Sequence, residues 1–199
     1  MTHKTSVTKQ PHKPDTAFWR AVETLLGRIA TEVLAGVKHP ISALIAGGVA
    51  VHYYTESRVS DDIDLEFSHR ILLPHTFSTF FVHGDEERHI AIDTNYSTAL
   101  GLMHPDYKED AVYIETIGDV IRVNVLSALD LAVSKTARFQ DNDKSDILAL
   151  AQMGLLSESE FVARVNEALK YYVGNTDFIK YNIDDVVNMV ESCRTQTPG

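Results

Sequence analysis

The stretch Asp62-Ile63-Asp64-Leu65-Glu66-Phe67 alternates without a break between acidic and apolar side chains. Because successive side chains of a β-strand point to opposite faces, this alternation predicts a strand with one buried apolar face and three carboxylates on the other. Asp62 and Asp64 then lie about 7 Å apart along the backbone, and their oxygens can converge on one divalent cation. The same alternation is also typical of an ordinary antiparallel strand whose polar face is solvated.

A glycine pair lies shortly before this acidic strand. Residues 43–46 form a short apolar segment, predicted to be a buried strand, that stops at Gly47 and Gly48, and residues 49–54 are predicted to be helical. Glycines at the start of a helix let backbone N–H groups approach a phosphate chain closely, although a tight turn alone explains such a pair equally well. The order strand, glycine pair, helix and acidic strand is more specific than either motif alone.

Residues 45–67 resemble the signature of the nucleotidyltransferase superfamily related to DNA polymerase β. The resemblance rests on Ala46-Gly47-Gly48-Val49-Ala50, on Arg58 and Ser60, and on Asp62-Ile63-Asp64. It implies that Asp62 and Asp64 are catalytic and hold two Mg²⁺ ions, with Mn²⁺ as an alternative. It also implies that an NTP binds beside the glycine pair, Arg58 and Ser60 and donates a nucleoside monophosphate to an acceptor.

Members of this superfamily often place a third carboxylate for the metals on a later strand, and Asp93 is the candidate. In His89-Ile90-Ala91-Ile92-Asp93, the register that buries both isoleucines can put Asp93 beside Asp62 and Asp64. Asp93 also heads Asp93-Thr94-Asn95, a composition that is common in turns. Both interpretations stay open from the sequence.

The second half of the chain carries another resemblance. Asp130-Leu131-Ala132-Val133-Ser134-Lys135-Thr136-Ala137-Arg138, followed by Asn142-Asp143-Lys144-Ser145-Asp146, is similar to the distal motif of AbiEii-type and MenT-type nucleotidyltransferases. These families are associated with bacterial toxin–antitoxin and abortive-infection systems. The resemblance implies that Lys135 and Asp146 are catalytic groups that position the nucleotide and orient or deprotonate the acceptor, and that Arg138 binds phosphate. Asn142 stands where the family usually has Arg.

The alternative for this segment is an ordinary solvated helix face. Leu131, Lys135 and Arg138 share one face at helical spacing, so the two cations project together. They can meet a triphosphate, or they can form salt bridges with Asp143 and Asp146 on the next helix.

Periodicity divides the chain into an α/β half and a helical half. Helices and β-hairpins are expected at the following residues: a helix at 15–36 that packs on a sheet, hairpins at 79–94 and 111–125, and helices at 127–139, 142–153, 161–172 and 178–193. With the resemblance, these elements predict an α/β (α+β) fold in which a nucleotidyltransferase-type mixed sheet flanked by helices is followed by a C-terminal helical bundle. We expect a flexible basic tail at 1–14, the α/β core at 15–126 and the helical subdomain at 127–199.

Composition excludes several other classes of protein. The 199 residues carry a formal net charge of −10, which disfavours a polyanion on the surface as a whole. A single cysteine excludes a disulfide framework, and the longest apolar stretch, residues 41–51, is too short to span a membrane. We therefore expect a cytoplasmic protein with no membrane partner. His52 and the pair Tyr171-Tyr172 are expected to be packing residues.

Together the two resemblances imply a Mg²⁺-dependent nucleotidyltransferase whose acceptor is an RNA, such as a tRNA 3′ end, or a protein. The enzyme is expected to be the toxin-like component of a bacterial two-gene system, with a cognate antitoxin protein as partner. One alternative is an antibiotic-type enzyme that modifies a small cationic molecule, which the acidic surface would attract. The other is a non-catalytic antitoxin or binding module on the same fold.

Overall fold

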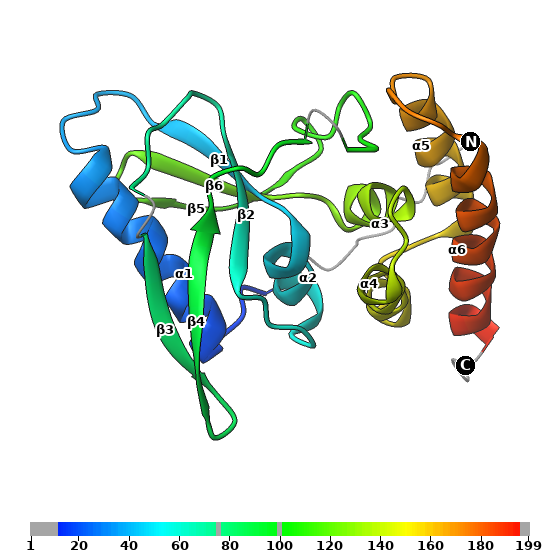
Figure 1. The fold of residues 1–199 in the computed structure, drawn as a ribbon, viewed down its shortest axis with the longest axis horizontal. Helices are drawn as coiled ribbons and strands as arrows, with labels where there is room; N and C mark the ends of the chain where they lie inside the picture. Colours follow the sequence, from blue (N-terminus) through cyan, green and yellow to red (C-terminus); the bar gives the residue numbers. More distant parts are fainter. Residues whose placement is uncertain (1–11, 75–76, 99–100, 196–199) are drawn as a thin grey trace, which may run out of the picture.

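The structure is a computed structural model that describes residues 12–74, 77–98 and 101–195. Within these residues the chain forms a six-stranded mixed sheet and six α-helices (Figure 1), which confirms the predicted α+β class. The strands are β1 Ile41–Ile45, β2 Asp62–Phe67, β3 Ser78–His83, β4 Glu86–Asp93, β5 Val112–Ile117 and β6 Ile121–Val125. The helices are α1 Ala17–Arg28, α2 Gly47–Thr55, α3 Ala128–Thr136, α4 Asp141–Gln152, α5 Glu158–Leu169 and α6 Asp177–Thr195.

The sheet has the strand order β3-β4-β2-β1-β6-β5. β1 pairs antiparallel with β2 and parallel with β6, and β2 pairs parallel with β4. Strand β2 has the bounds that the alternation predicted, and its Ile63 and Leu65 are buried in the core. The carboxylates of β2 therefore lie on the opposite face of the sheet, away from this part of the core.

Helix α1 packs against β3, where the rings of Phe18 and Phe81 meet edge-on with their centroids 5.1 Å apart. This contact confirms the prediction that the first helix packs on a sheet. The α-helix is shorter than expected, because after Arg28 it widens into a π-helical turn, η1 (Ile29–Val33). There the Leu34 N–H donates to the Ile29 carbonyl at 3.0 Å, five residues back.

Both predicted hairpins are confirmed. β3 and β4 are antiparallel and meet at Gly84-Asp85, and Gly84 has φ +63°. β5 and β6 meet at Gly118-Asp119, where both residues have φ +58°. Tight hairpin turns need positive φ at the first central residue or at both, and glycine and aspartate tolerate it better than most other residues.

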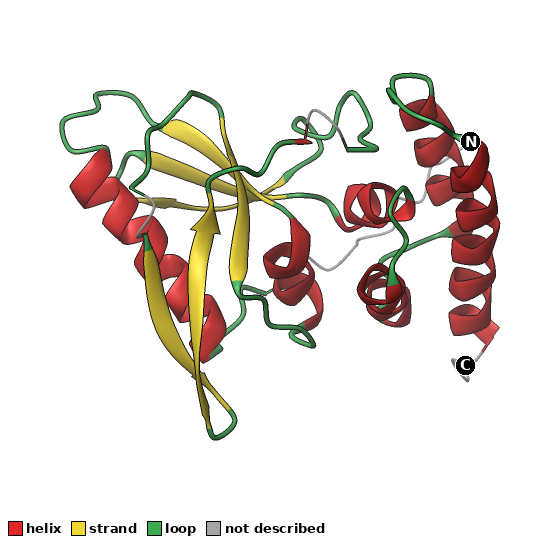
Figure 2. Ribbon diagram, in the orientation of Figure 1, coloured by secondary structure: helices red, strands yellow, loops and turns green. Residues whose placement is uncertain are grey.

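Helices α3 to α6 pack on one another and occupy the side of the molecule away from the sheet (Figure 2). The spacings Ser127–Asp130 and Ser157–Glu160 in the sequence predict capping boxes at two helix starts. The structure confirms both serines as caps: Ser127 accepts from the Asp130 N–H at 3.0 Å, and Ser157 accepts from the Glu160 N–H at 3.3 Å. None of the helices in the described part of the chain is long and apolar enough to cross a membrane.

Most of the predicted basic tail, residues 1–11, lies outside the described residues. Its last lysine, Lys13, is fixed by ion pairs with Glu23 at 2.6 Å and with Glu115 at 3.1 Å. The chain is thus already attached to α1 and β5 at this point.

Candidate active site

The acidic face of β2 forms one wall of the candidate site. Asp62 and Asp64 share this face because they are two residues apart on a strand. The parallel register of β2 and β4 sets Asp93 directly beside Asp64. Asp93 also accepts a hydrogen bond from the Asn95 N–H at 2.8 Å, so it faces the carboxylates and heads a turn at the same time. Its role as a metal ligand stays a prediction.

The glycine pair makes room for side chains of the site. Gly47 has φ +56°, and a Cβ there would overlap the Asp64 carboxylate. A Cβ on Gly48 would come within 3.1 Å of Ser60 and 3.2 Å of Arg58. The start of α2 therefore packs directly against Asp64, Ser60 and Arg58. The space that a side chain at residue 47 would occupy is filled by the Asp64 carboxylate.

The pKa of Asp64 is raised by its burial and by the negative charges around it. Burial, and then the negative charges of Asp62 and Asp93, raise the pKa of Asp64 from 3.8 to about 6, although Lys135 and Arg138 lower it in part. A divalent cation beside these carboxylates would remove the repulsion and favour the ionised form. The site is therefore arranged so that a cation stabilises it.

The segment that leads into β2 is held from both sides. Ser60 donates its hydroxyl hydrogen to Asp62 Oδ1 at 2.6 Å. His52 Nδ1 donates to the Arg58 carbonyl at 2.5 Å, and its Nε2 lies 2.8 Å from the Thr16 hydroxyl. Burial lowers the pKa of His52, so the ring is neutral at pH 7 and Nε2 accepts from Thr16. The contacts confirm His52 as a packing residue, one that also fixes Arg58.

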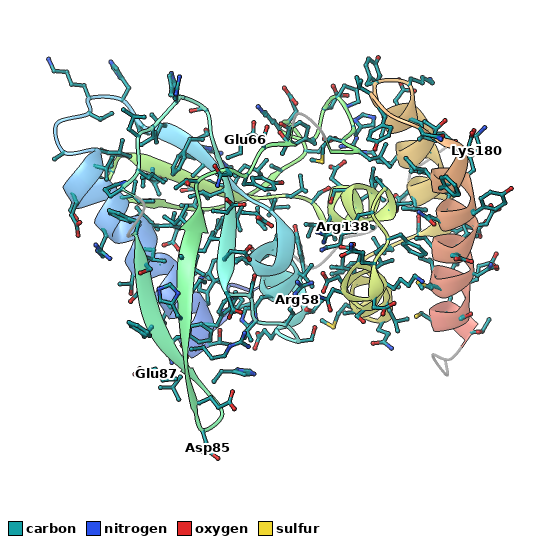
Figure 3. The ribbon with its side chains drawn as sticks, viewed as in Figure 1. Arg58, Glu66, Asp85, Glu87, Arg138 and Lys180 are labelled. Atoms are coloured by element: carbon teal, nitrogen blue, oxygen red, sulfur yellow. The ribbon has the colours of Figure 1, made fainter. Side chains whose placement is uncertain are left out.

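The cations of the helical half form a connected cluster with two carboxylates on α4. Lys135 Nζ lies 2.7 Å from Asp146 and 3.5 Å from Asp143. Arg138 donates to both oxygens of Asp143 at 2.8 Å, and Arg58 pairs with Asp146 across the two halves of the chain. Figure 3 shows Arg58 beside α2, on the side that faces α4, and Arg138 near the end of α3.

This cluster combines the two interpretations of the motif. The salt-bridge partners expected for an ordinary helix face are present, but the face is not solvated, since the Lys135 side chain is only 7% exposed. The Arg138 side chain is 62% exposed. Arg138 also lies beyond the end of α3, which stops at Thr136 before Phe139 reverses the chain with φ +49°. Lys135 and Arg138 nevertheless project together as predicted, since both contact Asp143 and line the same cleft.

One cleft of about 660 Å³ brings most of these residues together. It is lined by nine of the ten predicted site residues: Gly47, Gly48, Arg58, Ser60, Asp62, Asp64, Asp93, Lys135 and Arg138. The tenth, Asp146, lines an adjoining cleft and accepts from both Lys135 and Arg58. These two ion pairs fit the predicted role of Asp146 in positioning, and its role toward the acceptor stays a prediction.

The donor set suits Mg²⁺ bound together with a substrate. Within the described residues no group of three or more His, Cys, Asp or Glu side chains is gathered closely enough to hold a metal by itself. Mg²⁺ is commonly held by one or two carboxylates, by water and by substrate phosphates, which is the arrangement that Asp62 and Asp64 can provide.

The sequence missed several residues of the cleft because they belong to no motif. Tyr96 and Tyr172 line it, and burial, followed by the charges of Asp64 and Glu66, raises the pKa of the Tyr96 hydroxyl. Tyr171 is exposed, so the prediction that it packs was wrong.

From the sequence, Glu66 was recognised only as the third carboxylate of the alternating strand. It accepts hydrogen bonds from Thr98 and Tyr107, which brings the segment after β4 against the open face of the sheet.

Comparison with known proteins agrees with the motifs. A family model described as "Nucleotidyltransferase of unknown function (DUF6036)" matches residues 26–190, which include all ten predicted site residues. Neither the curated proteins nor the solved structures give a match to this chain. The match does not single out the AbiEii or MenT types. Because the family model covers most of the chain, the protein belongs to this family of nucleotidyltransferases, DUF6036.

Proposed function

We propose that this protein is a divalent-cation-dependent enzyme that transfers a nucleoside monophosphate from an NTP to the hydroxyl of an acceptor. The proposal rests on one observation, the presence of carboxylates and cations from the two halves of the chain in the same cleft. Asp62 and Asp64, on β2, line the same cleft as Lys135 and Arg138, which come from the other half of the chain. Paired carboxylates facing cations across a cleft are suited to binding metal ions and a polyphosphate together.

Each group has a defined part in this proposal. Asp62 and Asp64 would hold Mg²⁺, which when bound neutralises phosphate charge and activates the acceptor hydroxyl. Lys135 and Arg138 bind the polyphosphate, and Arg138 can bind a second anion because its exposed guanidinium has five N–H donors. Asp143 and Asp146 hold these cations in place from α4.

The acceptor class rests on the resemblance of residues 130–146 to toxin–antitoxin enzymes. On that basis the proposed acceptor is an RNA, such as a tRNA 3′ end, or a protein, and the protein is the toxin-like member of a two-gene system with a cognate antitoxin. The net charge of −10 favours a second candidate, a small cationic acceptor. Incubation with labelled NTPs, total tRNA, cell protein and aminoglycosides separates these acceptors, and the neighbouring gene identifies an antitoxin.

The reaction type is tested by Asp62→Asn and Asp64→Asn. We expect each variant to fold and to lose transfer by roughly 100-fold or more in Mg²⁺, because each removes a proposed metal ligand. The matched control is Asp85→Asn, since Asp85 projects from the tip of the β3–β4 hairpin, far from the cleft (Figure 3). If an Asn variant keeps near wild-type turnover, or if the purified protein binds neither Mg²⁺ nor NTP, the catalytic assignment is wrong.

A further inference from the structure

A second cleft, of about 640 Å³, adjoins the nucleotide cleft. Arg58, Ser60, Asp62 and Asn142 line both, so they form the boundary between the two spaces. The Asp62 carboxylate is thus accessible from either side. Arg88 on β4 and Ser145 on α4 line only the second cleft.

The lining of the second cleft is polar, and it contains two arginines and the three carboxylates of Asp61, Asp62 and Asp146. Arg88 donates to Asp61 at 2.5 Å, and Arg58 pairs with Asp146. The Arg88 side chain is 30% exposed, whereas that of Asp61 is 72% exposed. Asp61 can therefore turn into solvent when an anion binds Arg88. Guanidinium groups bind phosphate through parallel N–H donors, and two of them in one cleft suit an anionic ligand.

The reaction itself needs two spaces on opposite sides of the α-phosphorus. In phosphoryl transfer the attacking and leaving oxygens lie roughly in line, so the acceptor approaches from the side away from the pyrophosphate. In the proposed function, Lys135 and Arg138, which line the first cleft, hold the polyphosphate on that side. The second cleft, which meets the first at Asp62, is then open for the acceptor.

We infer that the second cleft binds the acceptor as a ribose hydroxyl next to a phosphate, with Arg88 and Arg58 holding that phosphate. This inference rests on the proposed function. The acceptor oxygen forms a bond to the α-phosphorus of the NTP, and the bond between that phosphorus and the bridging oxygen to the β-phosphorus breaks. Pyrophosphate leaves and the hydroxyl proton passes to solvent. The 3′ end of an RNA and a free dinucleotide share this chemistry.

Two pairs of variants test the site. Arg88→Glu reverses a charge of the second cleft, and its control is Arg122→Glu, because Arg122 lies on β6 outside both clefts. Ser145→Trp fills the cleft, and its control is Leu148→Trp, at an exposed position on the same helix that lines neither cleft. Binding of total tRNA and of a dinucleoside monophosphate is measured without NTP, and NTP binding and transfer of labelled nucleotide are measured separately.

We expect Arg88→Glu to weaken binding of the ribose-phosphate probes by roughly 10- to 100-fold, because one charge-assisted hydrogen bond contributes about that much affinity. The affinity for NTP should stay unchanged. Ser145→Trp should block transfer without affecting NTP binding, and both controls should behave as wild type. Binding of either probe supports the inference, and binding of only one of them tells an RNA end from a free dinucleotide.

Wild-type affinity for the probes in both Arg88→Glu and Ser145→Trp would overturn the inference, as would transfer only to protein. Because the probes are tested without NTP, their binding does not depend on turnover. If the unaltered protein does not bind NTP, that result contradicts the proposed function instead.

Discussion

Gly47 shows how one residue fixes the geometry of the site. Its φ of +56° and the Asp64 carboxylate beside it leave no room for a side chain. We expect Gly47→Ala to displace Asp64, to reduce transfer by roughly 100-fold and to lower the free energy of unfolding by about 1–3 kcal/mol. Denaturant unfolding and transfer assays measure both effects.

Gly27→Ala is the matched control for this substitution. Gly27 lies within α1, and nothing stands within 4 Å of an added Cβ. Alanine there should keep full activity and raise stability by up to about 1 kcal/mol, because alanine favours the helix. Equal activity of the two glycine variants would show that Asp64 does not depend on Gly47.

Asp64 makes stability depend on pH in a defined direction. Its pKa is about 6 in the folded protein and 3.8 for an ordinary aspartate, so the folded state holds the proton more tightly. Between pH 4 and pH 6 the free energy of unfolding therefore falls as pH rises. Above pH 6 Asp64 is ionised in the folded protein, and the full loss of stability is present. The causes are burial and the charges of Asp62 and Asp93.

Asp64→Asn removes this cost because the amide does not ionise. We expect the variant to be more stable than wild type by about 3 kcal/mol at pH 7 without divalent cations, and the difference to disappear near pH 3. Mg²⁺ should raise the melting temperature of wild type more than that of the variant. Thermal unfolding across pH, with and without Mg²⁺, measures these shifts. A constant difference at all pH values would contradict the raised pKa.

At the scale of secondary-structure elements, the junction of α3 and α4 contains cations of unequal burial. Lys135 is buried between Asp143 and Asp146, whereas Arg138 is mostly exposed and pairs with Asp143. Lys135→Ala should therefore lower the free energy of unfolding by about 2–3 kcal/mol, because it leaves buried carboxylates less compensated, and Arg138→Ala by less than about 1 kcal/mol.

Both substitutions should weaken NTP binding by roughly 10- to 100-fold, and the double variant should lose less than the sum if both cations hold one phosphate chain. Calorimetric titration with NTP measures the affinities of the three variants. Unchanged NTP affinity in the double variant would remove this junction from the nucleotide site.

The same elements show what the sequence could predict. The alternation of residues 62–67 fixed both the bounds and the faces of β2, because a strand with one buried face has no other register. Serine caps likewise located the starts of α3 and α5. Contacts between distant segments were not predictable: Arg58 with Asp146 and Tyr172 in the cleft depend on how the halves pack, and local periodicity carries no information about that.

At the scale of the whole molecule, the α/β half and the helical half are joined by charged contacts as well as by the core. Arg164 on α5 donates to both oxygens of Asp130 on α3 at 2.8 Å, and it also pairs with Asp110, just before β5, at 2.7 Å. One guanidinium thus connects two helices of the bundle to the segment that leads into the last hairpin.

The two carboxylates on Arg164 provide an internal comparison, since the side chain of Asp130 is 1% exposed and that of Asp110 is 53% exposed. Asp130→Asn should lower the free energy of unfolding by about 3 kcal/mol, because it removes the negative charge of a buried ion pair and one of the two oxygens that accept from Arg164 and Ser127. Asp110→Asn should cost less than about 1 kcal/mol, as exposed pairs do. Urea unfolding of both variants measures the difference. Equal losses would mean that Arg164 stabilises the protein through the contact between the halves rather than through the buried pair.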